Sequence, residues 1–313
     1  MKPPFPYYGG KTRVAEEIAS ILPAHRHYVE PFFGAGSVLL AKPPIMMETV
    51  NDINGDLVHF FRTLRDRPAD LERACFLTPH ARGEFLDAHV HRGEDADDIE
   101  RARRTFVILS QGRNASLRKT GWAHFQNPGN MSNAGARPSY IQRMVGRFAG
   151  IADRMLNVSI ENRDALQVIA EYGSHRDVLL YVDPPYLVST RTSRGYEVEF
   201  DRPEQHEALL QALLDCEASV VLSGYDSDLY ADMLATWQTH TLAGARDARG
   251  QARREVIWSN RPLGGPETLF DQLVHSSADP VRCPKCGGPH PFHDPACVVH
   301  PDLIQDQSGT GAE

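Results

Sequence analysis

Short apolar runs alternate with amphipathic patterns along most of the chain. Compact apolar or alternating runs predict strands, and apolar residues three or four positions apart predict helices. The predicted strands span residues 27–29, 158–164, 178–181, 219–223 and 255–260, and a further strand ends near residue 52. The predicted helices span residues 14–22, 165–172, 203–214 and 226–237. This rhythm predicts an α/β fold, in which a parallel sheet has helices on both faces.

A mainly helical segment interrupts the rhythm after the strand that ends near residue 52. Its helical pattern covers residues 56–98, and a polar, glycine-bearing stretch follows at 118–138. We therefore expect two domains, one of them discontinuous. They are a sheet domain at residues 1–56 and 153–265 and an inserted, mainly helical domain at residues 57–152.

The strongest chemical signal in the sequence is the end of the strand at 178–181. Asp183 follows this strand, and Pro184, Pro185 and Tyr186 come directly after it. Each proline fixes its backbone φ angle and lacks an amide hydrogen, so the strand cannot continue through them. The result is a rigid loop that holds a carboxylate, free carbonyl groups and an aromatic ring together. Because open α/β sheets bind ligands at the carboxyl ends of their strands, we expect a functional site here.

Two segments near the amino terminus carry features of a nucleotide site. Tyr7 and Lys11 flank a pair of glycines, which permits close approach of a ligand, although an ordinary turn before a helix explains the same residues. Gly34 and Gly36 form a turn between a strand and a helix, in a shorter form of the dinucleotide fingerprint. Asp52 stands where an acid binds ribose hydroxyl groups in such units, and capping of the next helix is its alternative role.

Positive charge is concentrated in one part of the chain. The formal net charge is −8, which argues against indiscriminate binding of nucleic acid. Residues 101–152 nevertheless contain no Asp or Glu. The basic residues in this stretch are Arg101, Arg103, Arg104, Arg113, Arg118, Lys119, Arg137, Arg143 and Arg147. In its polar second part, after Arg118, the rings of Trp122, His124, Phe125 and Tyr140 lie among the basic residues. Since basic groups can contact phosphates and rings can stack on bases, we interpret the stretch as a nucleic-acid contact rather than a solvated loop.

The carboxyl-terminal part has a different character, because three of the five cysteines lie there. The spacing C-x2-C-x10-C-x2-H is formed by Cys283, Cys286, Cys297 and His300. Two close pairs suit a tetrahedral structural zinc ion, with His290 or His293 as an alternative to His300. We expect a small zinc-ribbon-like tail at 280–302 and a disordered segment at 303–313.

The chain has no apolar run of membrane-spanning length. The prolines close behind Lys2 are unlike a signal peptide, and the odd number of cysteines is unlike a disulfide framework. We therefore expect a cytoplasmic protein without membrane contact.

Taken in order, the segments resemble the Dam-type, α-class adenine-specific DNA methyltransferases over about residues 5–262. Each motif is short, but four motifs in the order of the family are specific. The four are Tyr7-Tyr8-Gly9-Gly10-Lys11 for the amino-terminal cofactor motif, Glu30–Ser37 for the glycine motif, Asp52-Ile53-Asn54 for the ribose-binding acid motif, and Asp183-Pro184-Pro185-Tyr186 for the catalytic motif. The family usually has tryptophan at the position of Tyr7. The tyrosine keeps an aromatic contact there.

The resemblance implies a Rossmann-like fold and transfer of a methyl group from S-adenosylmethionine to the exocyclic amine of an adenine flipped out of double-stranded DNA. Asp183 and the Pro184 carbonyl would accept the two amino hydrogens, and Tyr186 would stack on the base. The implied catalytic residues are Asp183, Pro184, Pro185 and Tyr186, and the implied cofactor-binding residues are Tyr7, Lys11, Gly34, Gly36, Asp52, Asp164 and Asp183. The resemblance implies that residues 1–56 and 153–265 form the methyltransferase domain and that residues 57–152 form the DNA target-recognition insert. The expected DNA-binding residues are Arg113, Asn114, Arg118, Lys119 and Arg137. Capping of the helix at 165–172 is an equal alternative for Asp164.

Three other functions fit parts of the sequence. Methylation of the cytosine amine or of adenine in RNA uses the same geometry, although an acid at Asp183 favours adenine over cytosine. A catalytically silent DNA-binding protein is disfavoured by the intact catalytic motif. A dehydrogenase is disfavoured because only the glycine turn and Asp52 suggest binding of a nicotinamide cofactor. We expect a monomer, and both a lone methylase and the partner of a restriction enzyme fit the sequence.

Overall fold

The computed structural model describes residues 1–94, 96–124, 137–187, 200, 202–243 and 255–264. Met1–Pro266 forms one compact unit, to which all of these residues belong. The expected zinc-ribbon-like tail and the expected disordered segment lie outside the described residues, as does Phe125.

Within the described residues, seven strands form one sheet in the order β3-β2-β1-β4-β5-β7-β6. The strands are β1 (His27–Glu30), β2 (Met47–Asn51), β3 (Val158–Glu161), β4 (Val178–Val182), β5 (Ser219–Tyr225), β6 (Gln238–Thr241) and β7 (Glu255–Ser259). The first five are parallel, as the strand–helix rhythm predicts. The prediction of a fully parallel sheet is wrong at one edge, because β7 is antiparallel to both β5 and β6.

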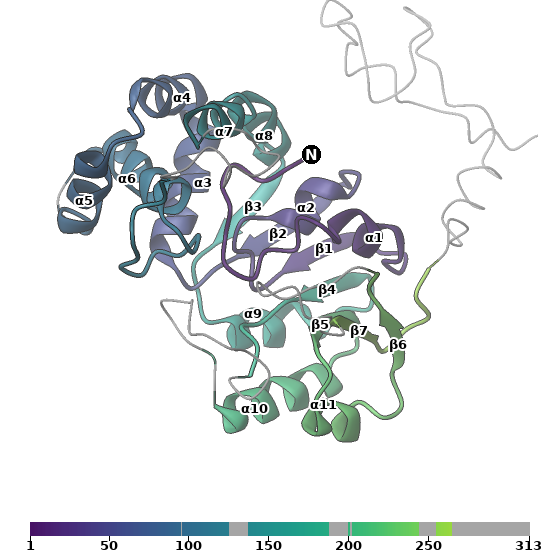
Figure 1. The fold of residues 1–313 in the computed structure, drawn as a ribbon. Helices are drawn as coiled ribbons and strands as arrows, with labels where there is room; N and C mark the ends of the chain where they lie inside the picture. Colours follow the sequence, from purple (N-terminus) through teal and green to yellow (C-terminus); the bar gives the residue numbers. More distant parts are fainter. Residues whose placement is uncertain (95, 125–136, 188–199, 201, 244–254, 265–313) are drawn as a thin grey trace, which may run out of the picture. The chain divides into compact units, whose positions relative to one another are not determined.

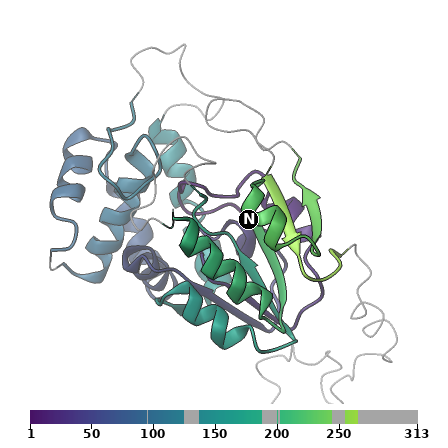
Figure 2. The ribbon, with the colours of Figure 1, turned by 90° about the horizontal axis from the view of Figure 1, so that it is seen from below.

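Helices cover both faces of the sheet, as predicted (Figure 1). Alternate strand residues face opposite sides, so Leu179 and Tyr181 of β4 pack in one core, and Leu180 and Val182 pack in the other. The first core is covered by α1 (Ala15–Ser20), α2 (Ser37–Ala41) and the helices that follow β2, and the second by α9 (Ala165–Tyr172), α10 (Pro203–Leu214) and α11 (Asp228–Met233). Figure 2 shows α9 and α10 running across the second face.

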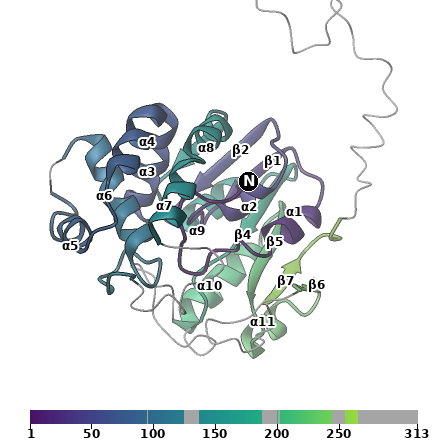
Figure 3. The same cartoon turned by 45° about the horizontal axis from the view of Figure 1, so that its top comes forward.

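The segment between β2 and β3 is helical, as predicted, and gathers beside the β3–β2 side of the sheet (Figure 3). Its helices are α3 (Gly55–Asp66), α4 (Pro68–Leu77), α5 (Arg82–Val90), α6 (Asp98–Gln111), α7 (Arg137–Val145) and α8 (Phe148–Met155). The Phe60 ring of α3 lies 4.8 Å from the Phe5 ring and 5.7 Å from the Phe148 ring of α8. The helical segment therefore shares one apolar core with the amino-terminal segment and the sheet. The boundaries of a separate helical domain stay a prediction.

Three element boundaries differ from the predictions. The strand predicted at 158–164 ends at Glu161, because Asp164 instead caps α9 by accepting a hydrogen bond from the Leu166 amide at 2.8 Å. The helix predicted at 226–237 is shorter, since α11 ends at Met233. The edge strand β6 was not predicted, because its largely exposed residues form no apolar pattern.

No helix in the described part of the chain has both the length and the apolar character that a membrane crossing requires.

Candidate active site

A cavity of about 500 Å³ opens at the carboxyl ends of the parallel strands. Residues that follow β1, β2 and β4 line it, together with the amino-terminal segment and the beginnings of α9 and α10. The predicted site residues that line it are Tyr7, Lys11, Gly34, Asp52, Asp164, Asp183 and Pro185. The structure thus brings residues from four distant motifs together in this cavity. It lies at the carboxyl ends of the strands, where an open α/β sheet binds a ligand.

The glycine turn after β1 needs its glycines. Gly34 and Gly36 have φ angles of +53° and +71°, which side-chain-bearing residues rarely adopt. A Cβ atom on Gly34 would lie 3.0 Å from the Tyr7 ring, and one on Gly36 would lie 2.5 Å from the Phe33 ring. The turn therefore brings backbone close to the aromatic wall of the cavity. Gly36 is also the residue that immediately precedes α2.

Asp52 fastens this turn to the end of β2. Its Oδ2 accepts a hydrogen bond from the Gly34 amide at 2.8 Å, and its Oδ1 accepts one from the Asn54 amide at 2.9 Å. Burial raises the pKa of Asp52 above its usual value, although both backbone hydrogen bonds act in the opposite direction. Capping of α3 is done by Asn54, whose side chain accepts from two amides of the first turn, so helix capping is not the role of Asp52.

Asp183 forms an ion pair with Lys11 in the wall of the cavity. The Lys11 ammonium nitrogen lies 2.6 Å from Oδ1 and 2.7 Å from Oδ2 of Asp183, and it also donates to the Gly9 carbonyl. Lys11 is only 4% exposed, whereas the Asp183 side chain is 16% exposed. Burial alone would lower the pKa of Lys11, but the charges of Asp183 and Glu255 outweigh it and raise that pKa. For Asp183 burial is the larger effect, so its pKa is raised despite Lys11.

Tyr186 is buried behind Asp183 and reaches a residue that the sequence analysis missed. The Tyr186 hydroxyl donates to Glu255 Oε1 at 2.7 Å and lies 3.1 Å from Asp183 Oδ1. Glu255 Oε1 is also 3.2 Å from the Lys11 ammonium nitrogen. The sequence signal for Glu255 is a single acid at the start of an otherwise apolar strand. Pro184 is buried beside Asp183 and, like Tyr186, is not among the described residues that line the cavity.

Of the two roles expected for Asp164, the structure shows the helix cap. Its side chain caps α9, and the same residue lines the cavity. A cofactor contact by Asp164 stays a prediction.

Four of the five expected DNA-binding residues lie on a narrow loop after α6. Two backbone hydrogen bonds close this loop, from the Arg113 amide to the Gly121 carbonyl at 3.0 Å and from the Ala123 amide to the Gln111 carbonyl at 2.8 Å. The predicted contacts that are exposed on it are Arg113, Asn114, Arg118 and Lys119. The Ala115 carbonyl accepts a hydrogen bond from the Tyr8 amide at 2.8 Å, so the loop adjoins the amino-terminal wall of the cavity.

Arg137 and Trp122 are engaged within the protein. Arg137 is half-buried and donates to the Gly112 carbonyl at 2.9 Å, which ties the start of α7 to the loop. The Trp122 ring stacks on the His80 ring at 4.6 Å and on the His124 ring at 5.0 Å. Contacts of these residues with DNA stay predictions, and both residues stabilise the loop that presents the exposed ones.

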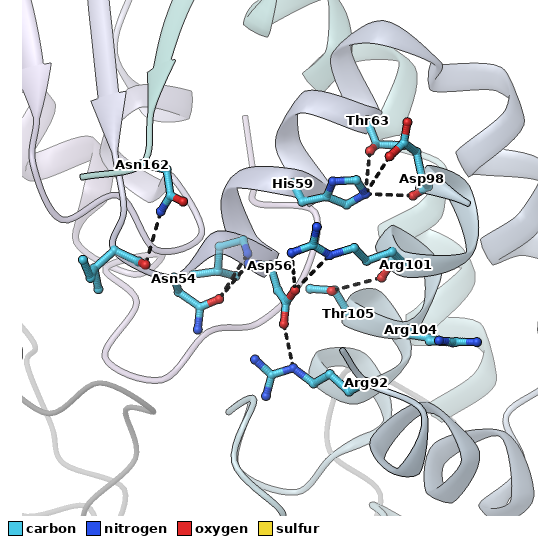
Figure 4. A network of polar contacts seen from close by, with 12 residues as sticks. Asn54, Asp56, His59, Thr63, Arg92, Asp98, Arg101, Arg104, Thr105 and Asn162 are labelled. Atoms are coloured by element: carbon cyan, nitrogen blue, oxygen red, sulfur yellow. Dashed lines mark hydrogen bonds and ion pairs between the residues drawn. The ribbon is translucent and has the colours of Figure 1, made fainter. Parts of the chain in front are cut away.

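Three arginines of the basic stretch pair with acids that precede this stretch in the sequence. Asp56 of α3 binds Arg101 at 2.9 Å and Arg92 at 2.7 Å (Figure 4). Arg103 and Arg104 bind Glu100 at 2.6 and 2.8 Å, and Arg103 also reaches a second glutamate on α5. The interpretation of the whole stretch as one positive surface is therefore wrong for its first part, because these arginines tie helices together.

The comparison with protein families decides the identity of the chain. Residues 7–246 match the sequence model of the D12 class N6 adenine-specific DNA methyltransferases. The chain belongs to this family. It is therefore an adenine-specific DNA methyltransferase, which uses S-adenosylmethionine as methyl donor and DNA as substrate. The resemblance inferred from the four motifs is confirmed.

Curated relatives of this D12-class methyltransferase have matching names. The DNA adenine methylase of Vibrio cholerae serotype O1 is 29% identical over 285 residues, which are 85% of this chain and 92% of the relative. The type II methyltransferase M1.LlaDCHI of Lactococcus lactis subsp. cremoris is 25% identical over 276 residues, covering 82% of this chain and 93% of the relative. The DNA N-6-adenine-methyltransferase of Escherichia phage P1 is 38% identical over 230 residues, which are 67% of this chain and 28% of that protein.

Proposed function

We propose that the D12-class methyltransferase methylates the exocyclic nitrogen of an adenine flipped out of double-stranded DNA, with Asp183 and the Pro184 carbonyl as hydrogen-bond acceptors. The lone pair of this nitrogen is delocalised into the ring, so acceptors that draw its hydrogens make it a better nucleophile. Flipping is required because a paired base cannot reach a cofactor in the cavity. Tyr186 supplies an aromatic ring directly after the acceptors.

One observation carries the proposal. Asp183 lines the cavity, and Lys11 binds both of its oxygen atoms while leaving the carboxylate partly exposed. Lys11 fixes the orientation of the carboxylate before a substrate arrives. An acceptor oriented in advance needs little rearrangement during the reaction, which is the main way in which such a site lowers its barrier.

The cavity fits S-adenosylmethionine. Its volume of about 500 Å³ lies within the range of cofactor sites. The backbone at Gly34 lines the cavity without a Cβ atom. Asp52, which lines the cavity after β2, is the proposed ligand of the ribose hydroxyl groups. Tyr7, Lys11 and Asp164 complete the proposed cofactor-binding wall. When bound, the cofactor supplies an electrophilic methyl group on a sulfonium that already carries its leaving group.

Sequencing of DNA from cells that express the chain tests this function. We expect N6-methyladenine at one recurring sequence in DNA from a host that lacks adenine methylation. The same host that expresses the Asp183→Ala variant is the control, and its DNA should stay unmodified. Methylation of cytosine amines, or of RNA alone, would overturn the proposal.

We expect the exposed basic residues of the loop after α6 to contact DNA phosphates. Replacing Arg113 and Arg118 by glutamine should weaken binding at low salt and reduce the slope of log K against log salt by about two, because each lost phosphate contact removes about 0.9. The matched control is Arg176→Gln, whose side chain is 81% exposed and lies before β4, at the opposite edge of the sheet. An unchanged slope in the double variant would contradict a phosphate contact.

The proposal of a structural zinc ion in the carboxyl-terminal tail is based on the spacing of its cysteine and histidine residues. We expect about one equivalent of zinc per chain in metal analysis of the purified protein. Cys283→Ser should remove it, whereas Cys216→Ser should not, because Cys216 is half-buried next to α10 and outside the motif. A metal-free wild-type protein would refute the zinc site.

A further inference from the structure

Glu255 places a buried carboxylate next to Asp183. It is the first residue of β7, is 9% exposed, and pairs with Tyr225 of β5. Because β7 is antiparallel to the other strands, its first residue lies at the edge where β4 and β5 end. A side chain at the start of β7 therefore reaches the loop that follows β4.

The Glu255 carboxylate competes with Asp183 for the hydroxyl proton of Tyr186. The Tyr186 oxygen lies 2.7 Å from Glu255 Oε1 and 3.1 Å from Asp183 Oδ1. Ser223 Oγ is more distant, at 3.4 Å. A phenol has one hydrogen to donate, so the shorter bond to a charged acceptor takes it. Asp183 then keeps the lone pairs of its Oδ1 for Lys11 and for a ligand.

The same strand pair also holds the ring of Tyr186. The Tyr225 ring packs edge-on against it, with 4.5 Å between the ring centroids. The Lys11 ammonium nitrogen lies 4.8 Å from the Tyr186 centroid. Tyr225 and Glu255 are register partners, so neighbouring positions of β5 and β7 fix both the ring and the hydroxyl of Tyr186. These contacts hold the Tyr186 ring and its hydroxyl in one orientation.

We propose that Glu255 is a positioning residue of the methyl-transfer site, which holds the Tyr186 hydroxyl and so keeps Asp183 available for the adenine amino group. The inference rests on the function proposed for Asp183 and Tyr186. The negative charge of Glu255 is essential, because a neutral acceptor at this position loses the phenol proton to the Asp183 carboxylate. Asp183 is then a poorer acceptor for the amino hydrogens.

Glu255→Gln tests the inference, since it keeps the shape and an acceptor oxygen but removes the charge. We expect kcat to fall about tenfold, because a hydrogen bond to a charged acceptor is stronger than one to a neutral acceptor by about this factor. KM for S-adenosylmethionine should stay within about twofold of the wild-type value. In the Tyr186→Phe background no hydroxyl competes for Asp183. There the same substitution should change kcat by less than about twofold.

The comparison between the two backgrounds separates positioning from general damage. Glu217→Gln is the matched control, because this glutamate is exposed and pairs with Arg176 at the opposite edge of the sheet. If Glu255→Gln lowered kcat equally in both backgrounds, the proposal would be overturned. This includes an equal loss caused by a folding defect, which thermal unfolding would detect. An unchanged kcat in the enzyme that keeps Tyr186 would also overturn it. An inactive wild-type chain would instead refute the proposed function of Asp183 and Tyr186.

Discussion

Replacing Asp183 by alanine is expected to slow methyl transfer by about a hundredfold to a thousandfold, the usual effect of removing one oriented group that acts in the transition state. The variant loses the carboxylate that accepts an amino hydrogen, and Lys11 loses the partner that orients it. DNA affinity should change little, because the exposed basic residues lie on the loop after α6. Single-turnover transfer of a labelled methyl group measures the rate, and fluorescence anisotropy measures DNA binding at fixed salt.

Asp226→Ala is the matched control for this prediction. Asp226 directly follows β5, the neighbour of β4, and is exposed without lining the cavity. Its replacement should leave the rate unchanged. Asp183→Asn should fall between wild type and Asp183→Ala, because its amide oxygen still accepts a hydrogen bond. If Asp183→Ala kept wild-type turnover, the catalytic role of this carboxylate would be wrong.

Replacing Lys11 by methionine is expected to lower the free energy of unfolding by about 3–5 kcal/mol, because two buried carboxylates then lack their cation. Lys11 is the ammonium that Asp183 and Glu255 share. Burial already raises the pKa of Asp183 in the folded state, and without the Lys11 charge that pKa should rise further above its unfolded value. A carboxylate with a raised folded-state pKa binds more protons in the folded state, so stability falls as pH rises. The loss should therefore be larger at about pH 8 than at about pH 5.

Urea unfolding at the two pH values measures this effect. Lys42→Met is the matched control, because it also removes a buried lysine paired with a glutamate, Glu48 at 2.5 Å. Glu48 keeps a second cation, Arg154, so this variant should lose less stability and show a weaker pH dependence. Equal losses in the two variants, or a Lys11→Met loss independent of pH, would contradict the shared-cation interpretation.

The local elements of the fold were predictable because short stretches of sequence encode them. Apolar periodicity located α10 at its observed bounds, and the two prolines after Asp183 marked the end of β4. The glycine turn was recognisable because glycine is the residue that most readily adopts the positive φ angles found at Gly34 and Gly36. These signals sufficed to place four motifs at one edge of a sheet.

Features that depend on distant partners were not predictable. The apolar pattern of β7 does not reveal its direction, so nothing in the sequence indicated that Glu255 lies at the edge where β4 and β5 end. β6 is an edge strand whose polar residues face solvent, and periodicity gives it no signal. The arginines at the start of α6 were counted as free positive charge, because Asp56, which neutralises Arg101, lies far earlier in the sequence.

The central claim is that this chain methylates the amino group of adenine in DNA. Unmethylated double-stranded DNA can be incubated with the purified chain and S-adenosylmethionine labelled in its methyl group, digested to nucleosides and separated by chromatography. We predict that the label appears in N6-methyldeoxyadenosine and is absent with Asp183→Ala. Label in a methylated deoxycytidine, or no label in DNA with a folded wild-type chain, would contradict the account.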